Sequence, residues 1–437
     1  MKPKLRVPFA NLKFENWQNL ILVVVFIFYL FQFGFLIFKD GFLRGYGVDY
    51  LAFWSAGKIA DDKGYAEIYD LENLRLIQTQ VLEDRGILVK GDKLNFSPFP
   101  AAIFSIFHLP FQFLSRVDPM QSYWIWTIIN LAVLIGYLIF FVRKVQNNNS
   151  PLSSNRKMLL IMLLSFPVFV SLMEGQVEVF LLVCTGEFIR YALIKKPLPS
   201  GLWLGGLLLK PQILIIIIPL LLLQKNWKVI LGFFASSILI LGISLLLSGF
   251  KGMISLIRLW TQFSAGIATS SPEAMINWRM IAENLNSPFG WVIAILGMTL
   301  SLIAVIFLVK NNYAFGTSHW VMIMLGVFSA TLVITWHSHY HMAMVLIPFL
   351  IFCSLSKMLS EKISLFWAVM TPLMLIALTI ISIFVLALTK LSFIYNGGLL
   401  LGLSGFLLNL AILIFALRFF HIKNESPNLP DSGNPLV

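Results

Sequence analysis

The sequence predicts an all-α membrane protein whose helices cross the bilayer many times. Of its 437 residues, 58% are hydrophobic and only 12% are charged. Apolar runs of about 18 or more residues recur along the whole chain, which is the pattern of transmembrane helices. These runs do not alternate with a period of two residues, so a transmembrane β-barrel is excluded.

The net charge of +12 does not indicate nucleic acid as a partner. The Lys and Arg residues lie mostly in short loops, as the positive-inside bias requires. Cys184 and Cys353 lie within apolar runs, so we expect two free thiols and no disulfide. The sequence has no phosphate-binding loop, dinucleotide fingerprint, nucleophile elbow or HExxH motif, so we expect no cofactor.

Twelve apolar segments predict a bundle of about 10–12 transmembrane helices. A basic N-terminus precedes the first segment, which is too long for a signal-peptide core, so we expect residues 1–19 to be cytoplasmic. Residues 20–419 then form one transmembrane domain, and 420–437 form a disordered cytoplasmic tail. The segments are 20–38, 98–115, 120–142, 157–173, 175–194, 200–223, 226–248, 288–309, 318–335, 340–357, 363–389 and 392–419.

Two long polar stretches, 39–97 and 249–287, are predicted to lie outside, together with the short loop 336–340. Two topologies remain for the first half of the chain. In one, all twelve segments cross the membrane. In the other, 98–115 lies along the outer face and 200–223 is a re-entrant pair broken at Lys210–Pro211. The second topology brings four basic residues inside: Arg143, Lys144, Arg156 and Lys157.

The first outer loop is predicted to be helical. Tyr50–Ala60 forms a short helix with Asp49 as its N-cap. A second helix begins after Asp70, ends at Gly86 and carries an apolar stripe. Both helices are amphipathic and directly follow the first crossing, so we expect them at the membrane surface. The stripe consists of Leu71, Leu74, Ile77, Val81 and Leu82.

Asp49 is the first candidate for chemistry, because a carboxylate at the membrane face can accept a proton from a hydroxyl nucleophile. Its alternative role is that of a helix cap, and the two roles are compatible. Asp49 has no second acidic neighbour in the sequence, which argues against an obligatory metal.

Three of the six histidines, His337, His339 and His341, lie within five residues near the outer end of a membrane helix. On a helix, the first and the last would share one face. Imidazoles here could bind phosphate, assist a base or ligate metal, and we expect no metal. The alternative is a belt of amphipathic residues at the interface, which Trp336 and Tyr340 would suit.

Lys210 lies in the middle of an apolar segment, directly before Pro211. A lone cation at membrane depth usually faces protein or water, so we expect it to bind an anionic group such as a lipid-linked phosphate. Its alternative is to snorkel from a broken helix end.

Three polar residues, Glu174, Gln176 and Glu178, surround Gly175 and form either a cavity lining or a plain turn. Arg279 in the second outer loop would suit a phosphate, although a solvated arginine is the alternative.

The order of these features resembles the integral-membrane glycosyltransferases of the GT-C fold, and most closely glycosyltransferase family 87, which includes polyprenyl-phosphate-mannose-dependent mannosyltransferases. The resemblance spans about residues 40–350 and rests on short motifs. These are Val48-Asp49-Tyr50, Trp54-Ser55-Ala56-Gly57 with Tyr65 and Tyr69, Asn95 to Pro100 with His108-Leu109-Pro110, Gly175-Gln176-Val177-Glu178, Gly201 to Lys210-Pro211, and Trp336 with His339.

Three departures from the family pattern occur. Phe96 and Ser97 replace Tyr-Pro, and Asn277-Trp278-Arg279 replaces Asn-Gln-Ser. Ser338 splits the paired histidines, so any of the three neighbouring imidazoles could be the equivalent.

The resemblance implies an inverting hexosyltransferase, or a transferase of a related sugar, that acts in a bacterial plasma membrane on its outer face. Its donor would be a polyprenyl-phosphate sugar, and its acceptor a glycan, lipid or glycolipid. Asp49 would be the general base, assisted by His339 or His341, and Lys210 would neutralise the leaving phosphate. Further substrate contacts would come from Tyr50, Gln176, Glu178, Arg279 and His337.

The competing function is a transporter or flippase of a lipid-linked or anionic substrate. Transporters often carry internal repeats, and the sequence shows none. A transporter also has no need of a structured outer loop that carries an exposed carboxylate.

Overall fold

The computed structural model describes residues 14–38, 48–87, 97–146, 155–264, 271–310, 313–389 and 397–425. These residues form helices and no strands, which confirms the all-α prediction. Six helices are long and apolar enough to cross a membrane: α1 (Phe14–Phe38), α5 (Pro119–Val145), α11 (Trp227–Ser264), α13 (Pro288–Lys310), α16 (Glu361–Thr389) and α17 (Gly397–Glu425). The chain is therefore a multi-pass membrane protein.

The other predicted crossings are shorter or bent. The pair α6 (Arg156–Leu163) and α7 (Phe166–Met173) bends by 46° and would make a seventh crossing. Five more helices within the predicted segments are shorter than a typical membrane span, so six or seven of the predicted 10–12 transmembrane helices have the length of a full crossing among the described residues. They are α8 (Glu178–Leu193), α9 (Pro197–Gly205), α10 (Leu214–Leu223), α14 (Ser318–Ile334) and α15 (Ile347–Leu355).

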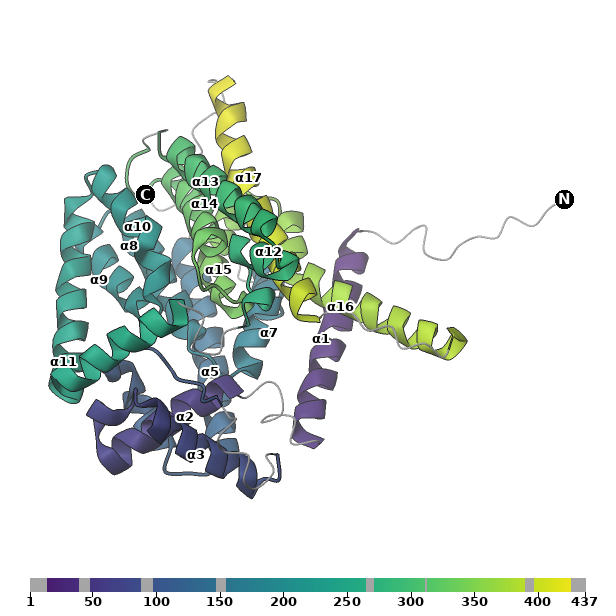
Figure 1. The fold of residues 1–437 in the computed structure, drawn as a ribbon. Coiled ribbons are helices and arrows are strands. Elements are labelled where there is room, and N and C mark those ends of the chain that lie inside the picture. The colour runs from purple at the N-terminus through teal and green to yellow at the C-terminus, as the bar shows by residue number, and fades with distance from the viewer. Residues whose placement is uncertain are drawn as a thin grey trace.

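The predicted helices of the first outer loop are both present, as α2 (Val48–Lys63) and α3 (Leu71–Asp84), and lie together at one end of the bundle (Figure 1). Asp70 caps α3 as predicted, because its carboxylate accepts a hydrogen bond of 2.8 Å from the backbone of Asn73. The cap prediction for Asp49 is wrong: α2 begins at Val48, so Asp49 lies in its first turn.

The apolar segment 98–115 is not a crossing helix. Residues 97–104 contain no helix, and only the short α4 (Leu109–Leu114) follows, after a 3₁₀ turn. The segment packs with α2, since the Trp54 indole donates to the carbonyl of Val117 (3.1 Å) and Arg116 pairs with Asp61 (2.9 Å). It therefore lies beside α2, the position that the second predicted topology gives it.

Helix α5 leads from this end of the molecule to the opposite one. Asp118 caps its start, and the same carboxylate pairs with Arg85 after α3 (2.5 Å). Beyond the far end of α5, Lys157 pairs with Glu361 at the start of α16 (3.5 Å). The basic residues of this region, including Arg143 and Lys144, therefore lie at the end opposite α2 and α3, again as in the second topology.

The segment 200–223 is broken at Lys210, as the second topology also predicts. Its backbone leaves the helical region there (φ −137°, ψ 78°), between α9 and α10. Gly201 of α9 lies so close to α11 that a Cβ atom on it would come within 1.9 Å of the Val229 carbonyl. Val229 lies in the first turn of α11, which begins shortly after α10 ends at Leu223. Helix α10 therefore returns to the end at which α9 began, and Lys210 lies at the tip of a re-entrant hairpin.

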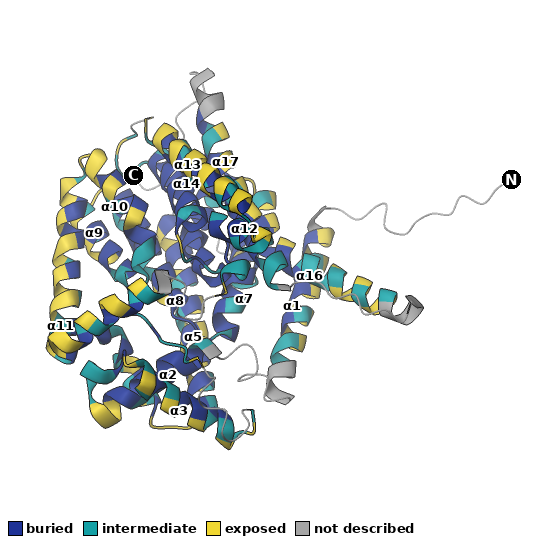
Figure 2. Cartoon of the chain, in the orientation of Figure 1, coloured by how far each residue is buried: buried dark blue, intermediate teal, exposed yellow. Residues whose placement is uncertain are grey.

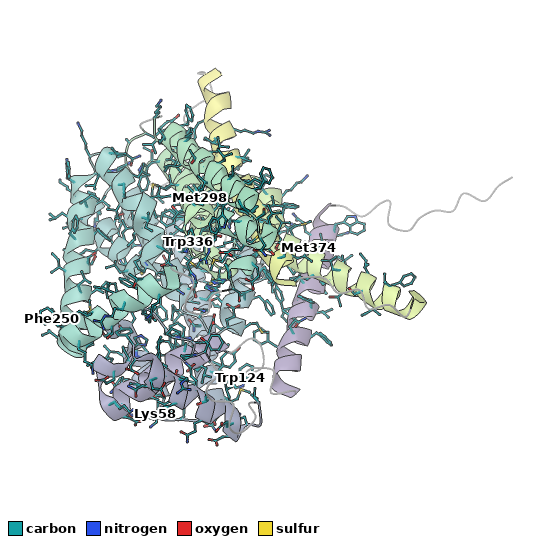
Figure 3. All side chains as sticks on the ribbon, viewed as in Figure 1. Lys58, Trp124, Phe250, Met298, Trp336 and Met374 are labelled. Atoms are coloured by element: carbon teal, nitrogen blue, oxygen red, sulfur yellow. The ribbon has the colours of Figure 1, made fainter. Side chains whose placement is uncertain are left out.

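Helix α11 bends at Gly249, whose backbone (φ 61°, ψ −177°) lies in a region that essentially only glycine adopts. The predicted outer loop 249–287 thus begins as helix. Lys251 pairs with Glu67 beside α2. Phe250 is 76% exposed, and Figure 3 shows it at the outer edge of the molecule near the bend.

The centre of the bundle is α14, which is buried on almost every face (Figure 2). A helix that is apolar all round is stable only when other helices surround it. The C-terminal α17, which packs on it, extends to Glu425, past the predicted start of the disordered tail at 420. The rest of that tail and residues 1–13 lie outside the described residues.

We expect Gly249→Ala to destabilise the protein by about 1–3 kcal/mol, because an alanine is strained at this backbone conformation. Gly242→Ala is the matched control, since it lies in the same helix with open space around it. The measurement is thermal unfolding of both purified variants in one detergent. Equal melting temperatures for the two variants would contradict the assignment of the bend to Gly249.

Candidate active site

The carboxylate of Asp49 is held by a turn between α7 and α8. Gly175 occupies the left-handed region (φ 65°), and the next residue, Gln176, donates a short hydrogen bond from Nε2 to Oδ2 of Asp49. A side chain on Gly175 would meet the ring of Tyr50, because an added Cβ atom would lie 2.7 Å from the Cβ of Tyr50. Glycine is therefore required where the turn approaches α2.

Helix α5 fixes this turn from the other side. The hydroxyl of Tyr123 donates to the carbonyl of Leu172 (3.0 Å), and the Trp126 indole donates to that of Gly175 (3.0 Å). Tyr50 is fully buried, with its hydroxyl 2.5 Å from that of Ser122. Tyr50, which was expected to contact substrate, thus packs beneath the turn, and Gln176 positions Asp49.

Glu178 joins three distant parts of the chain. Its buried carboxylate lies 3.5 Å from Nζ of Lys210 at the tip of the re-entrant hairpin, and 2.8 Å from Nδ1 of His341. The other imidazole nitrogen of His341 lies 3.7 Å from Glu174. The structure therefore brings the predicted carboxylate, ammonium and imidazole candidates into one cluster.

His337 and His341 do not share a helical face, which corrects the prediction. Helix α14 ends at Ile334, and a 3₁₀ segment begins only at Tyr340. The rings lie side by side along the connecting turn: His337 and His339 have centroids 4.8 Å apart, and His339 and His341 have centroids 5.8 Å apart. The turn therefore presents all three imidazoles to the same cluster.

Residues before α12 (Trp278–Leu285) hold the histidine turn in place. Asn277 donates from Nδ2 to the carbonyl of Thr335 (2.7 Å), and the backbone of Ile276 donates to the carbonyl of Ser338 (2.9 Å). The buried Arg279 pairs with Glu283 (3.0 Å), so the solvated-arginine alternative is wrong.

Arg279 also contacts an aromatic pair. Its guanidinium lies over the ring of Trp336, 4.5 Å from the ring centroid, and Trp336 stacks on Trp291. Trp336 is 40% exposed and is labelled in Figure 3. The stacked rings therefore cover one side of the arginine at the edge of the histidine turn.

Burial sets the protonation of the outer part of the cluster. It raises the pKa of Asp49, against the opposing effects of His341 and Lys210. It raises the pKa of Glu174 well above the usual range, and the charge of Asp49 adds to this. Burial lowers the pKa of His337 to about 3, so this imidazole is neutral at pH 7.

Glu174, for which the sequence left open a cavity lining or a plain turn, belongs to the cluster. It follows α7 and lies at the turn, and its carboxylate, that of Asp49 and the imidazole of His341 have ligand atoms within 4.8 Å of one another. Asp49 therefore has an acidic neighbour after all, and the argument against a metal that rested on its isolation is wrong. The only signal in the sequence was the acidic pair around Gly175.

The sequence profile of glycosyltransferase family 87 matches residues 97–335, which is more than half of the chain. The chain belongs to glycosyltransferase family 87. Comparisons with curated proteins and with solved structures return no match. The matched region of this glycosyltransferase contains Glu174, Glu178, Lys210 and Arg279. Asp49 precedes it, and the histidine turn follows directly after it.

We expect Lys210→Met to destabilise the transferase by about 1–3 kcal/mol, because the carboxylate of Glu178 is buried and loses its ammonium partner. The double variant Lys210→Met with Glu178→Gln should be more stable than Lys210→Met alone, since no unpaired charge remains. Thermal unfolding in detergent measures both. A double variant no more stable than the single variant would show that the pair is not coupled.

Proposed function

We propose that this family 87 glycosyltransferase moves a sugar, mannose or another hexose or pentose, from a polyprenyl-phosphate donor to an acceptor, with inversion at the anomeric carbon. The observation that carries the proposal is the convergence of Asp49, Lys210 and the imidazoles in one site. An inverting displacement needs one base for the acceptor and one stabilised leaving group, and this cluster supplies candidates for both.

Asp49 is the proposed general base. An acceptor hydroxyl gives its proton to this carboxylate while its oxygen forms a bond to the anomeric carbon of the donor. The bond from that carbon to the phosphate oxygen breaks, and polyprenyl phosphate leaves with the electron pair. The hydrogen bond from Gln176 fixes one carboxylate oxygen and leaves the other for the acceptor.

The donor phosphate is proposed to bind between Lys210 and the histidine turn. The lysine lies at the tip of a hairpin and 3.5 Å from Glu178, and the donor phosphate is proposed to approach it from the bilayer. His337 and His339 lie next to each other on that turn and are the proposed hydrogen-bonding groups, and the buried guanidinium of Arg279 adds positive charge. These contacts would strengthen as negative charge develops on the leaving phosphate.

The site is proposed to face the outside of a bacterial plasma membrane. The basic Arg143, Lys144 and Lys157 lie at the end of the molecule opposite α2, and positive residues favour the cytoplasmic side. At the outer face, cytoplasmic ATP and nucleotide sugars are not available, and a donor carried on a polyprenyl lipid meets that constraint. The acceptor is a glycan, lipid or glycolipid.

We expect Asp49→Asn to lower sugar transfer by about 10²–10⁴-fold with normal expression, because the amide cannot accept the proton. Asp62→Asn is the matched control, since Asp62 is an exposed residue of α2 that pairs with Lys58. The measurement is transfer from synthetic polyprenyl-phosphate sugars in membranes that contain each variant.

Two results, one from this assay and one from this assay together with an uptake measurement, would contradict the proposal. Full activity of the Asp49→Asn variant would remove Asp49 from the role of base. Inactivity of the parent protein with every lipid-linked donor, together with uptake of substrate into vesicles, would favour a transporter.

For the donor site, we expect Lys210→Met to raise the KM for the lipid-linked sugar by about 10- to 100-fold, as the loss of a charged hydrogen bond predicts. Lys251→Met, which removes an exposed lysine paired with Glu67, should leave that KM unchanged. Kinetics are normalised to folded protein, so that a loss of stability is not read as a loss of binding. An unchanged KM in Lys210→Met would exclude this lysine as a phosphate ligand.

A further inference from the structure

We propose that Asp49, Glu174 and His341 form a binding site for one divalent metal ion. Each residue offers one ligand atom, and these atoms lie within 4.8 Å of one another. Bonds from zinc to carboxylate oxygens and imidazole nitrogens are about 2.0–2.2 Å long, so a slight closing of the side chains brings all three atoms onto one ion. The three residues come from α2, the turn after α7, and the 3₁₀ segment after α14.

A second observation concerns the orientation of the imidazole. His341 is 3% exposed, and its Nδ1 lies 2.8 Å from the fully buried carboxylate of Glu178. This contact directs Nε2 toward Glu174, at a distance of 3.7 Å that is too long for a hydrogen bond. A histidine that binds a metal usually gives its other nitrogen to a carboxylate in this way. Glu178 thus has the position of a residue that orients a ligand.

The charges of the cluster also suit a divalent cation. The carboxyl groups of Asp49, Glu174 and Glu178 lie together, and Lys210 pairs with that of Glu178. Metal ligands bind in their deprotonated form, and the two positive charges of one divalent ion would balance the carboxylates of Asp49 and Glu174.

The ligands indicate the class of metal. Carboxylate oxygens suit Mg²⁺ and Mn²⁺, and an imidazole nitrogen favours the transition metals. A site with two carboxylates and one imidazole therefore suits Mn²⁺ or Zn²⁺, with the remaining positions open to an oxygen of substrate. An ion here would bind the acceptor hydroxyl and lower its pKa, and a lone pair of the Asp49 carboxylate that binds neither the ion nor Gln176 would still accept the proton. This chemical role rests on the proposed function, whereas the binding itself does not.

The test is Mn²⁺ binding to the purified full-length protein in detergent after dialysis against EDTA, followed by electron paramagnetic resonance without donor or acceptor. We expect one bound Mn²⁺ per chain and a hyperfine coupling to one imidazole nitrogen. His341→Ala should abolish the nitrogen coupling. Glu174→Gln should weaken binding at least about tenfold, as should Glu178→Gln through the orientation of the imidazole.

Glu361→Gln is the matched control, because Glu361 pairs with Lys157 at the opposite end of the molecule. Its affinity for Mn²⁺ should equal that of the parent protein. The proposal is overturned if the parent binds neither Mn²⁺ nor Zn²⁺, if its bound Mn²⁺ shows no nitrogen coupling, or if Glu174→Gln binds as tightly as the control. The nitrogen coupling is measured on the parent protein, so this test holds even if a variant fails to fold. Because no sugar substrate is present, failure of the transferase proposal would leave a positive binding result intact.

Discussion

The buried carboxylate of Glu178 is the constraint on which the site depends. It is fully buried, and it contacts both the ammonium of Lys210 and the imidazole of His341. Removing a partner from such a group leaves a charge that the surrounding protein cannot solvate. The contacts therefore hold together the start of α8, the tip of the re-entrant hairpin and the segment after α14.

The surrounding helices explain why these polar groups can meet inside an apolar bundle. The hairpin of α9 and α10 carries Lys210 into the molecule and returns to the end where it began. The turn at Gly175 brings Gln176 against Asp49, and residues before α12 fix the histidine turn. Backbone that leaves the helical conformation is thus found where it lines the cluster, as membrane proteins require.

Much of this arrangement could be predicted from local signals. The carboxylate of Asp70 and the following apolar stripe predicted α3, and the Lys210–Pro211 pair predicted the break in its segment, because caps and prolines act over a few residues. The motifs around Asp49 and Gly175 also led to the correct family.

The wrong predictions concern segments whose structure is determined by tertiary contacts. The segment 98–115 is apolar because it packs on α2, and hydropathy alone cannot distinguish that packing from a membrane crossing. The histidines leave the helix because their turn is held by Asn277, which is distant in sequence. The partnership of Glu174 with His341 likewise joins residues far apart in the chain. No local sequence pattern predicts contacts between residues so far apart in the chain.

The contacts of Glu178 with residues that follow it in the chain have a consequence for the synthesis of the protein. The ribosome makes this residue before Lys210 and long before His341, so the apolar helix α8 is complete while its glutamate has no partner. During that interval the carboxylate must remain hydrated or carry a proton. The cluster can therefore close only after the chain has been made as far as His341, which contacts Glu178 in the folded protein.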